Sequence, residues 1–311
     1  MKQTKYDYID RLHKGFVKVK LKGKWNFIDR EGNLISETWF DYCTEFNEGF
    51  AIVILDNKWN FIDKQGNIIS DKWFDKCGYF HDGFAAVTLN NKWNLIDKQG
   101  NLLSNQWFDY CGSFSKGFAR VKLNERWNFI DEQGNYLSDQ WFDNCGYFHE
   151  GFAKVKLKGK WNFIDKQCNF IGEQWFDWCN EFYEGFAAVE LNGKMNSIDK
   201  QGNYLSDKWF DYCWSFCDGF AKVRLNGKYN FIDKQCNHLS DQWFDDCFNF
   251  HEGFAKVRLN KKWNYIDYHG YLLSDQWLDS YGDFNNGFAR VIINGMHKVI
   301  STKGEILDEK N

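Results

Sequence analysis

The stretch KWNFIDKQGN at residues 58–67 decides the fold, because near-copies of it recur along the whole chain. KWNFIDREGN stands at 24–33, KWNLIDKQGN at 92–101 and KWNFIDKQCN at 160–169. A Gly-Phe pair follows the same rhythm, with its glycine at positions 15, 49, 83, 117, 151, 185, 219, 253 and 287. Nine 34-residue copies therefore follow one another without insertion or deletion, and a single repeat array is predicted over residues 5–310.

Each copy is predicted to contain a β-hairpin. In the copy at 117–150, polar and apolar side chains alternate over 118–123, which is typical of a half-buried strand. A second strand is predicted over 127–131. The link Asn124-Glu125 reads Asn-Gly in other copies, which is the strongest short signal for a tight hairpin turn.

The second half of the copy is less regular. The segment EQGN at 132–135 predicts a turn, because its glycine suits a positive φ. A short third strand is predicted over 136–138. In WFDNCGYF at 141–148, the Trp, Cys and Phe are spaced by four and three residues, and this spacing indicates a helical turn or a compact loop.

Besides the Gly-Phe pair, three further positions that are identical in all nine copies carry predictions. The aspartate of the WFD segment recurs from Asp7 to Asp279, and it is predicted to satisfy backbone N–H groups at a turn rather than to serve as a catalytic carboxylate. The other two are predicted core positions, because β-branched side chains suit a buried pleated surface. They are the valines at 19, 53, 87, 121, 155, 189, 223, 257 and 291 and the isoleucines at 28, 62, 96, 130, 164, 198, 232, 266 and 300.

These patterns predict an all-β protein built from tandem β-hairpin repeats. A unit of this size buries its apolar face only against its neighbours. The end copies diverge from the pattern: Lys5-Tyr6 replaces Trp-Phe, Ile9 replaces Cys, and Met296-His297-Lys298 replaces Lys-Trp-Asn. Divergent terminal copies are typical of capping repeats, so an open solenoid or superhelix is predicted. A closed toroid or β-propeller-like ring is the alternative, although propeller blades usually need about 40–45 residues.

Composition limits the function. Lys and Arg number 39 against 43 Asp and Glu, and a net charge of −4 argues against a generally basic nucleic-acid binder. The first sixteen residues contain no apolar run, and no segment approaches the ~18 apolar residues of a membrane span. We therefore expect neither a secretory signal nor a membrane segment, and we expect a cytoplasmic location.

The cysteines and motifs indicate no enzyme. Seven of the ten cysteines occupy one repeated position, and no CxxC pair occurs, so they are predicted to be small buried hydrophobes in a reduced compartment. Hydrolase, nucleotide-binding and zinc-protease signatures are absent from the sequence. We expect no catalytic residue, no bound metal and no cofactor.

The copies resemble the WG, or KWG, repeat family, whose pattern runs F-x-x-G-x-A-x-V and then K-W-G-[YF]-I-D-x-x-G. One copy carries that pattern at Phe80, Gly83, Ala85, Val87, Lys92, Trp93, Ile96, Asp97 and Gly100. The sequence departs from it after the tryptophan, where eight copies have asparagine. The resemblance implies a bacterial β-rich repeat protein and supplies no catalytic residues.

Two sets of residues are candidates for contact with a partner. With a two-residue turn, residue 20 faces residue 25 and residue 18 faces residue 27, which places basic side chains beside aromatic ones. The first set is Lys18, Lys20 and Trp25; Arg120, Lys122 and Trp127; Lys154, Lys156 and Trp161; and Lys256, Arg258 and Trp263. Such pairs either pack against the next repeat, with their charges in water, or form an exposed stripe for single-stranded nucleic acid or an anionic glycan.

The second set lies just before the repeated cysteine, where the residue differs from copy to copy. It includes Tyr110, Trp178 and Tyr212. Positions that vary among otherwise fixed copies are predicted to be exposed, and the variation reflects either drift or tuning to a partner. We therefore predict a non-catalytic scaffold that binds another protein, with nucleic acid or polysaccharide as the alternative partner.

Overall fold

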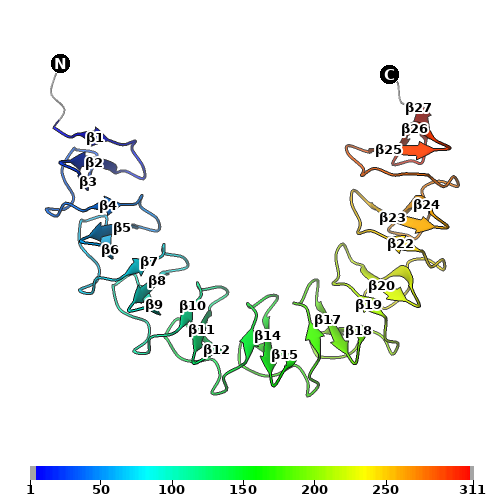
Figure 1. Cartoon of the computed structure of the whole chain (residues 1–311), viewed down its shortest axis with the longest axis horizontal. Coiled ribbons are helices and arrows are strands. Elements are labelled where there is room, and N and C mark those ends of the chain that lie inside the picture. The colour runs from blue at the N-terminus through cyan, green and yellow to red at the C-terminus, as the bar shows by residue number, and fades with distance from the viewer. Residues whose placement is uncertain (1–4, 309–311) are drawn as a thin grey trace. The chain divides into compact units, whose positions relative to one another are not determined.

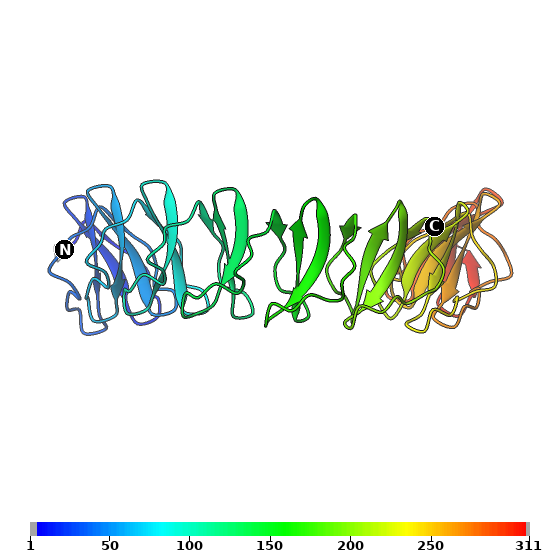
Figure 2. The ribbon, with the colours of Figure 1, turned by 90° about the horizontal axis from the view of Figure 1, so that it is seen from below.

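A computed structural model describes residues 5–308 of the chain. Within these residues the chain forms 27 strands and no helix. The chain divides into two compact units, with the boundary between Phe148 and His149, and each unit is a succession of small sheets (Figures 1 and 2). The all-β prediction is confirmed.

The first unit contains β1 (Tyr8–Ile9), β2 (Val17–Leu21), β3 (Lys24–Ile28), β4 (Tyr42–Cys43), β5 (Phe50–Leu55), β6 (Lys58–Asp63), β7 (Lys76–Cys77), β8 (Phe84–Leu89), β9 (Lys92–Asp97), β10 (Tyr110–Cys111), β11 (Ala119–Leu123), β12 (Arg126–Ile130) and β13 (Asn144–Cys145). The second unit contains β14 (Phe152–Leu157), β15 (Lys160–Asp165), β16 (Trp178–Cys179), β17 (Phe186–Leu191), β18 (Lys194–Asp199), β19 (Tyr212–Cys213), β20 (Ala221–Leu225), β21 (Lys228–Ile232), β22 (Asp246–Cys247), β23 (Phe254–Leu259), β24 (Lys262–Asp267), β25 (Phe288–Ile293), β26 (Met296–Ser301) and β27 (Ile306–Asp308).

These strands form three-stranded antiparallel sheets. The first unit holds β1-β2-β3, β4-β5-β6, β7-β8-β9 and β10-β11-β12, and the second holds β16-β17-β18, β19-β20-β21, β22-β23-β24 and β25-β26-β27. The two long strands of a sheet are the predicted hairpin. Asn124 and Glu125 both adopt a positive φ in the turn, which matches the right-handed twist of the flanking strands.

Residues 141–148 form no helical turn but the compact loop that was the alternative, except that Asn144 and Cys145 form a strand where none was predicted. The residue before each repeated cysteine and the cysteine itself form a two-residue strand that pairs with the hairpin of the following copy. In one such pair, Tyr110 lies opposite Lys122 and Cys111 lies opposite Val121. The spacing that suggested a helix arises because this backbone bonds to a distant strand edge, which local periodicity does not report. The third strand predicted over 136–138 is reduced to a single bridge between Ile130 and Tyr136.

The core lies between consecutive sheets. One cluster joins Phe27 of the first copy to Val53 and Ile62 of the second through Phe40 and Phe46. All nine predicted valines are buried, and the predicted isoleucines are buried except Ile28, which is half-buried. The seven repeated cysteines are also buried and unpaired, as predicted for small hydrophobes, and burial raises the pKa of the Cys43 thiol to about 12.

The asparagine that replaces the family's glycine is a buried polar anchor. The amide of Asn60 donates to the carbonyls of Ser70 at 2.8 Å and Lys72 at 3.1 Å, and its oxygen accepts the N–H of Phe61 at 2.8 Å. All eight such asparagines are at most 1% exposed. Each one ties its hairpin to the loop that leads to the next copy, because a buried amide must find hydrogen-bond partners.

The extent of the array was predicted to run to Lys310, which lies outside the described residues. The open arrangement of the array and its description as one domain remain predictions.

Candidate functional site

The outward side of each sheet carries a row of three side chains, one from each strand. In the sheet β10-β11-β12, Tyr110 lies opposite Lys122 and Lys122 lies opposite Trp127, as the hairpin geometry predicted. Other rows within the two units are Tyr42, Ile54 and Trp59; Lys76, Thr88 and Trp93; Trp178, Glu190 and Met195; Tyr212, Arg224 and Tyr229; and Asp246, Arg258 and Trp263.

The predicted basic and aromatic residues do meet on this side. Lys18 and Lys20 lie 5.7 and 5.1 Å from the ring centre of Trp25. The corresponding distances to the rings are 5.2 Å for Arg120 and 5.8 Å for Lys122 over Trp127, 5.6 Å for Lys154 and 5.5 Å for Lys156 over Trp161, and 5.3 Å for Arg258 over Trp263. Lys256 instead lies over Phe248 and Tyr281. Basic stems therefore cover the tryptophan rings, and these tryptophans are half-buried.

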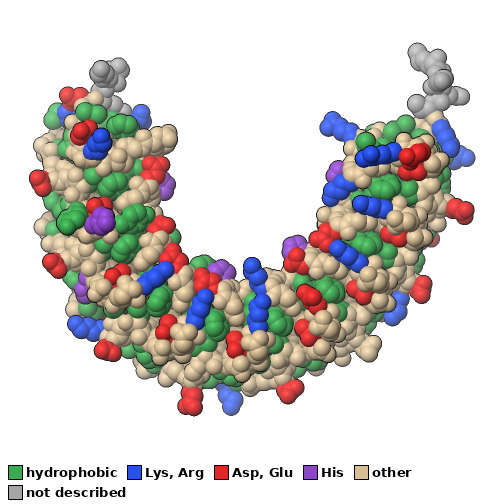
Figure 3. Space-filling model, turned by 180° about the vertical axis from the view of Figure 1, so that it is seen from behind, with side chains coloured by type: hydrophobic (Ala, Val, Ile, Leu, Met, Phe, Trp, Pro, Cys, Tyr) green, Lys and Arg blue, Asp and Glu red, His purple; other side chains and the backbone are tan. Residues whose placement is uncertain are grey.

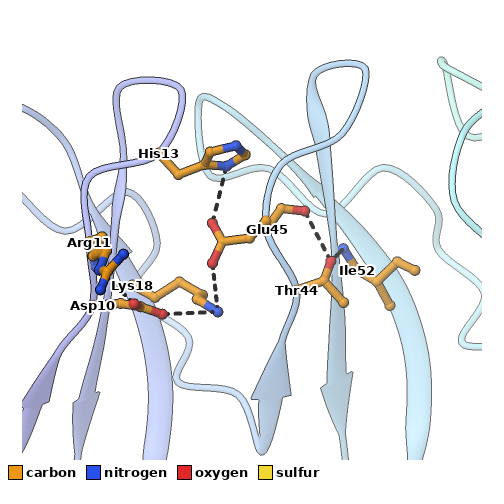
Figure 4. Close-up of polar contacts among 7 residues, drawn as sticks. All are labelled: Asp10, Arg11, His13, Lys18, Thr44, Glu45 and Ile52. Carbon is orange, nitrogen blue, oxygen red and sulfur yellow. Dashed lines mark hydrogen bonds and ion pairs between the residues drawn. The ribbon is translucent and has the colours of Figure 1, made fainter. Parts of the chain in front are cut away.

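In two copies the first basic residue of a pair also contacts the segment that leads into the next sheet. Figure 4 shows Glu45 between His13 and Lys18, with Lys18 Nζ 2.7 Å from Glu45 and 3.3 Å from Asp10. Burial opposes the charge of Lys18, but its hydrogen bonds to Glu45 and Asp10 outweigh burial and raise its pKa. Lys256 pairs in the same way with Asp283 at 2.6 Å. These cations hold neighbouring sheets together, so they are less available to a phosphate or glycan.

Further lysines are paired beside the hairpin turns. The fixed aspartate near the end of a copy binds the lysine that begins the second hairpin strand of the same copy, as Asp75 does with Lys58 at 2.5 Å. Figure 3 shows acidic and basic side chains interspersed over the face in view. This face has no extended surface of one sign of the kind that a nucleic-acid backbone requires.

The variable residues before the cysteines reach solvent. Tyr42, Trp178 and Tyr212 are exposed by 49, 39 and 41%, whereas Tyr110 is half-buried. Large aromatic side chains at the surface are the residues most enriched at binding hot spots. In the second unit, Trp178 and Tyr212 occupy the same register position of the neighbouring sheets β16-β17-β18 and β19-β20-β21, so exposed aromatic side chains recur there.

The second unit has an aromatic groove that the sequence did not predict. It lies in the second unit between the sheets β16-β17-β18 and β19-β20-β21 and has a volume of about 490 Å³. Trp178, Tyr183, Tyr212 and Trp214 line it together with Ala188. The sequence signal was the loss of the basic pair in this copy, where Ala188 and Glu190 stand in place of two lysines.

Other kinds of site are not assembled. Residues 5–308 contain no cluster of three His, Cys, Asp or Glu side chains that could hold a metal ion. In the same part of the chain, no helix has the length and apolar character needed to cross a membrane.

The repeated three-stranded sheets and the rows of side chains on them define a tandem β-repeat protein. The sequence profile described as "WG containing repeat" matches eight stretches that together cover more than half of the chain. They are residues 3–25, 27–59, 61–93, 95–127, 129–161, 176–194, 198–229 and 244–263. The chain therefore belongs to the WG repeat family, as its sequence pattern predicted. No curated protein matches the chain.

Solved structures give only distant similarity. Hsv2p of Kluyveromyces lactis is 10% identical, with 72% of this chain and 91% of that one covered and a TM-score of 0.33. Apo AztD from Citrobacter koseri is 11% identical, with 94% and 96% covered and a TM-score of 0.34. A structure described as the eukaryotic initiation factor is 9% identical, with 91% and 92% covered and a TM-score of 0.40. Likeness at this level supports no argument about function.

Proposed function

We propose that the protein is a non-catalytic scaffold that binds another protein through its variable outward side chains. The observation that supports this proposal is the exposure of Trp178 and Tyr212 at one register position of two successive sheets of the second unit, with Tyr42 exposed at the same register position in the first unit. Within a unit the backbone fixes the spacing of this position, while the side chain at each site is free to differ. Such a surface suits an extended partner that contacts several repeats at once. The unpaired buried cysteines are consistent with a cytoplasmic location.

The test compares two triple variants in capture from a lysate of the source organism. The first replaces Tyr42, Trp178 and Tyr212 with serine. The control replaces three exposed tyrosines outside the variable position, Tyr136, Tyr204 and Tyr271, with serine. We expect the wild type and the control to retain the same nuclease-resistant partner and the first variant to lose it. Equal capture by both variants would contradict the proposal.

Nucleic acid or polysaccharide is a second candidate, favoured by the basic side chains within 6 Å of Trp25, Trp127 and Trp161. Binding to nucleic acid through them would weaken steeply with salt, because cations on the protein release counterions. The variant Lys122→Glu/Lys156→Glu would then lose binding. Retention of the bound material at high salt, or by this variant, would count against this candidate.

A further inference from the structure

The contact between neighbouring sheets follows a pattern in the sequence. The residue at the position of Lys18 is matched by the residue 27 positions later, in the loop that enters the next hairpin. The pairs are Lys18–Glu45, Ile52–Tyr79, Ala86–Ser113, Arg120–Tyr147, Lys154–Glu181, Ala188–Ser215, Lys222–Asn249 and Lys256–Asp283. Lys18 and Lys256 each bind the carboxylate of their match, Arg120 lies over the ring of its match, and the two alanines are each matched by a serine. Where the first member is basic, its charge interacts with a carboxylate or an aromatic ring of the protein itself.

Two copies show what fills the space beside the rings. The guanidinium of Arg120 lies 3.7 Å from the ring centre of Tyr147 and donates to the carbonyl of Cys145 at 2.7 Å. Lys222 lies 4.1 Å from the ring centre of Trp214 and donates to the carbonyl of Cys247 at 3.3 Å. In both copies a cation rests on an aromatic ring and binds the carbonyl of the repeated cysteine in the next sheet.

The pair Ala188–Ser215 leaves this space empty. Ala188 has neither the length nor the charge to reach the equivalent carbonyl, that of Cys213, and both Ala188 and Cys213 line the 490 Å³ groove. The two rings that flank Arg120, those of Trp127 and Tyr147, are replaced by Met195 and Ser215 in this copy. Other rings line the groove instead: Tyr212 and Trp214 lie with their ring centres 4.0 Å apart, and Trp178 lines the same groove from the preceding sheet. The groove thus contains the repeated cysteine whose carbonyl binds a cation in two other copies, next to a different set of rings.

The charge beside the groove has also changed sign. The second basic position of the hairpin is Lys20, Lys122, Lys156, Arg224 or Arg258 in other copies, but it is Glu190 here. Glu190 lies opposite Trp178, is half-buried, and forms no ion pair within residues 5–308. The basic residues of the following hairpin are engaged elsewhere, since Lys222 lies over Trp214 and binds the carbonyl of Cys247, and Arg224 lies over Tyr229 at 5.6 Å. An unpaired carboxylate beside electron-rich rings favours a cationic occupant.

We propose that this groove binds an arginine side chain presented by the partner protein, which would bind the carbonyl of Cys213 as Arg120 binds that of Cys145. The proposal rests on the scaffold function and names the chemistry of one contact in it. Arginine fits better than lysine because its planar guanidinium stacks on rings while its N–H groups still bind a carboxylate and a carbonyl. The groove is also large enough for the side chain and its flanking backbone.

The test uses N-acetyl-arginine amide as the probe and N-acetyl-citrulline amide as its neutral match, with binding followed by saturation-transfer NMR and calorimetry. We expect the arginine probe to bind about tenfold more tightly than the citrulline probe, because only the former carries the charge that rings and carboxylate stabilise. Equal affinity for the two probes would overturn the proposal.

Matched variants locate the binding. Ala188→Lys/Ser215→Glu gives this interface the pair found at Lys18–Glu45, so we expect the protein to fold and the arginine probe to be excluded. Ala86→Lys/Ser113→Glu makes the same exchange at the other Ala–Ser interface, and we expect binding to be unchanged. A third variant, Glu190→Gln, preserves the shape of the side chain. It should lower the affinity for the arginine probe severalfold and leave the affinity for the citrulline probe unchanged. Binding that survives in Ala188→Lys/Ser215→Glu would overturn the proposal.

The same variants separate this proposal from the scaffold function. If the wild type and Ala188→Lys/Ser215→Glu capture a partner equally, the proposed arginine contact is contradicted and the proposed scaffold function is retained. If the probe binds as described but the wild type captures no partner from the lysate, the groove is supported and the scaffold function is contradicted.

Discussion

The carboxylate of Asp75 accepts the backbone N–H of Asn90 at 2.7 Å, although the two residues are fifteen positions apart. The same carboxylate binds Lys58 of its own copy through its other oxygen. Asp75 thus connects the hairpin of one copy to the hairpin turn of the next. The prediction that this fixed aspartate satisfies a backbone N–H group is confirmed, and in the same way Asp41 accepts the N–H of Asp56 and Asp109 accepts the N–H of Asn124.

Replacing Asp75 by alanine should destabilise the protein, because the N–H of Asn90 loses its acceptor and Lys58 loses its counter-ion. We expect a lower urea midpoint for Asp75→Ala. Asp71 is an exposed aspartate four residues away and makes none of these contacts, so Asp71→Ala serves as the control. Equal midpoints for the two variants would show that the aspartate has no structural role.

Stability should fall in acid for the same reason. Hydrogen bonds from lysine and from turn N–H groups lower the pKa values of Asp41, Asp75, Asp109, Asp177, Asp211, Asp245 and Asp279. A pKa that is lower in the folded state means that the stabilisation is complete above the ordinary aspartate value of about 3.9 and is lost as the pH falls through the folded value. Urea midpoints measured at pH 6, 4 and 3 at constant ionic strength should therefore decrease. A flat profile would contradict this account.

The buried asparagine should be one of the most sensitive polar positions. Asn60→Ala removes three hydrogen bonds and leaves the carbonyl of Ser70 and the N–H of Phe61 without their partner. We expect a loss of about 2–3 kcal/mol in the free energy of unfolding, because buried polar groups left unsatisfied carry their full desolvation cost. The control is Asn105→Ala at an exposed site, which should change the free energy by less than about 0.5 kcal/mol. Similar values for both variants would contradict the anchor role.

The glycine of the turn in KWNFIDKQGN is required by the neighbouring copy. A Cβ added at Gly66 would lie 1.5 Å from the carbonyl oxygen of Ile35, whereas one added at Gly83 would meet no atom within 4 Å. Both glycines have a positive φ, 87° and 89°. Gly83→Ala therefore measures backbone strain alone, on the order of 1 kcal/mol, and Gly66→Ala should cost clearly more. Calorimetry would compare the two. Equal losses of stability in the two variants would mean that the close approach of Ile35 to Gly66 adds no cost to the substitution.

Parts of the fold were predictable because they are local. The alternation over 118–123 and the Asn-Gly turns of other copies predicted the hairpin, and the register between Lys122 and Trp127 followed from the turn length. The strand at Tyr110–Cys111 was not predictable in this way, because its hydrogen bonds go to the next copy. The partial burial of Trp127 was not predictable either, because it depends on the conformations of the Arg120 and Lys122 side chains.

The candidate site was also predictable only in part. The sequence predicted that Trp178 and Tyr212 would be exposed, because their position varies among fixed copies. It showed that Ala188 and Glu190 break the basic pattern, but not that the resulting space opens between Trp178 and Trp214. That groove depends on the approach of two sheets from different copies.

The sequence by itself determined the repeat length, the number of copies, the hairpins and the core positions, because each of these is written in the spacing of residues along the chain. Only the tertiary structure decided that the sheets join adjacent copies, that lysines such as Lys18 are used between sheets, and that a groove opens between Trp178 and Trp214. These features depend on contacts between residues that lie 15 to 35 positions apart, and such contacts form only when one copy packs against the next.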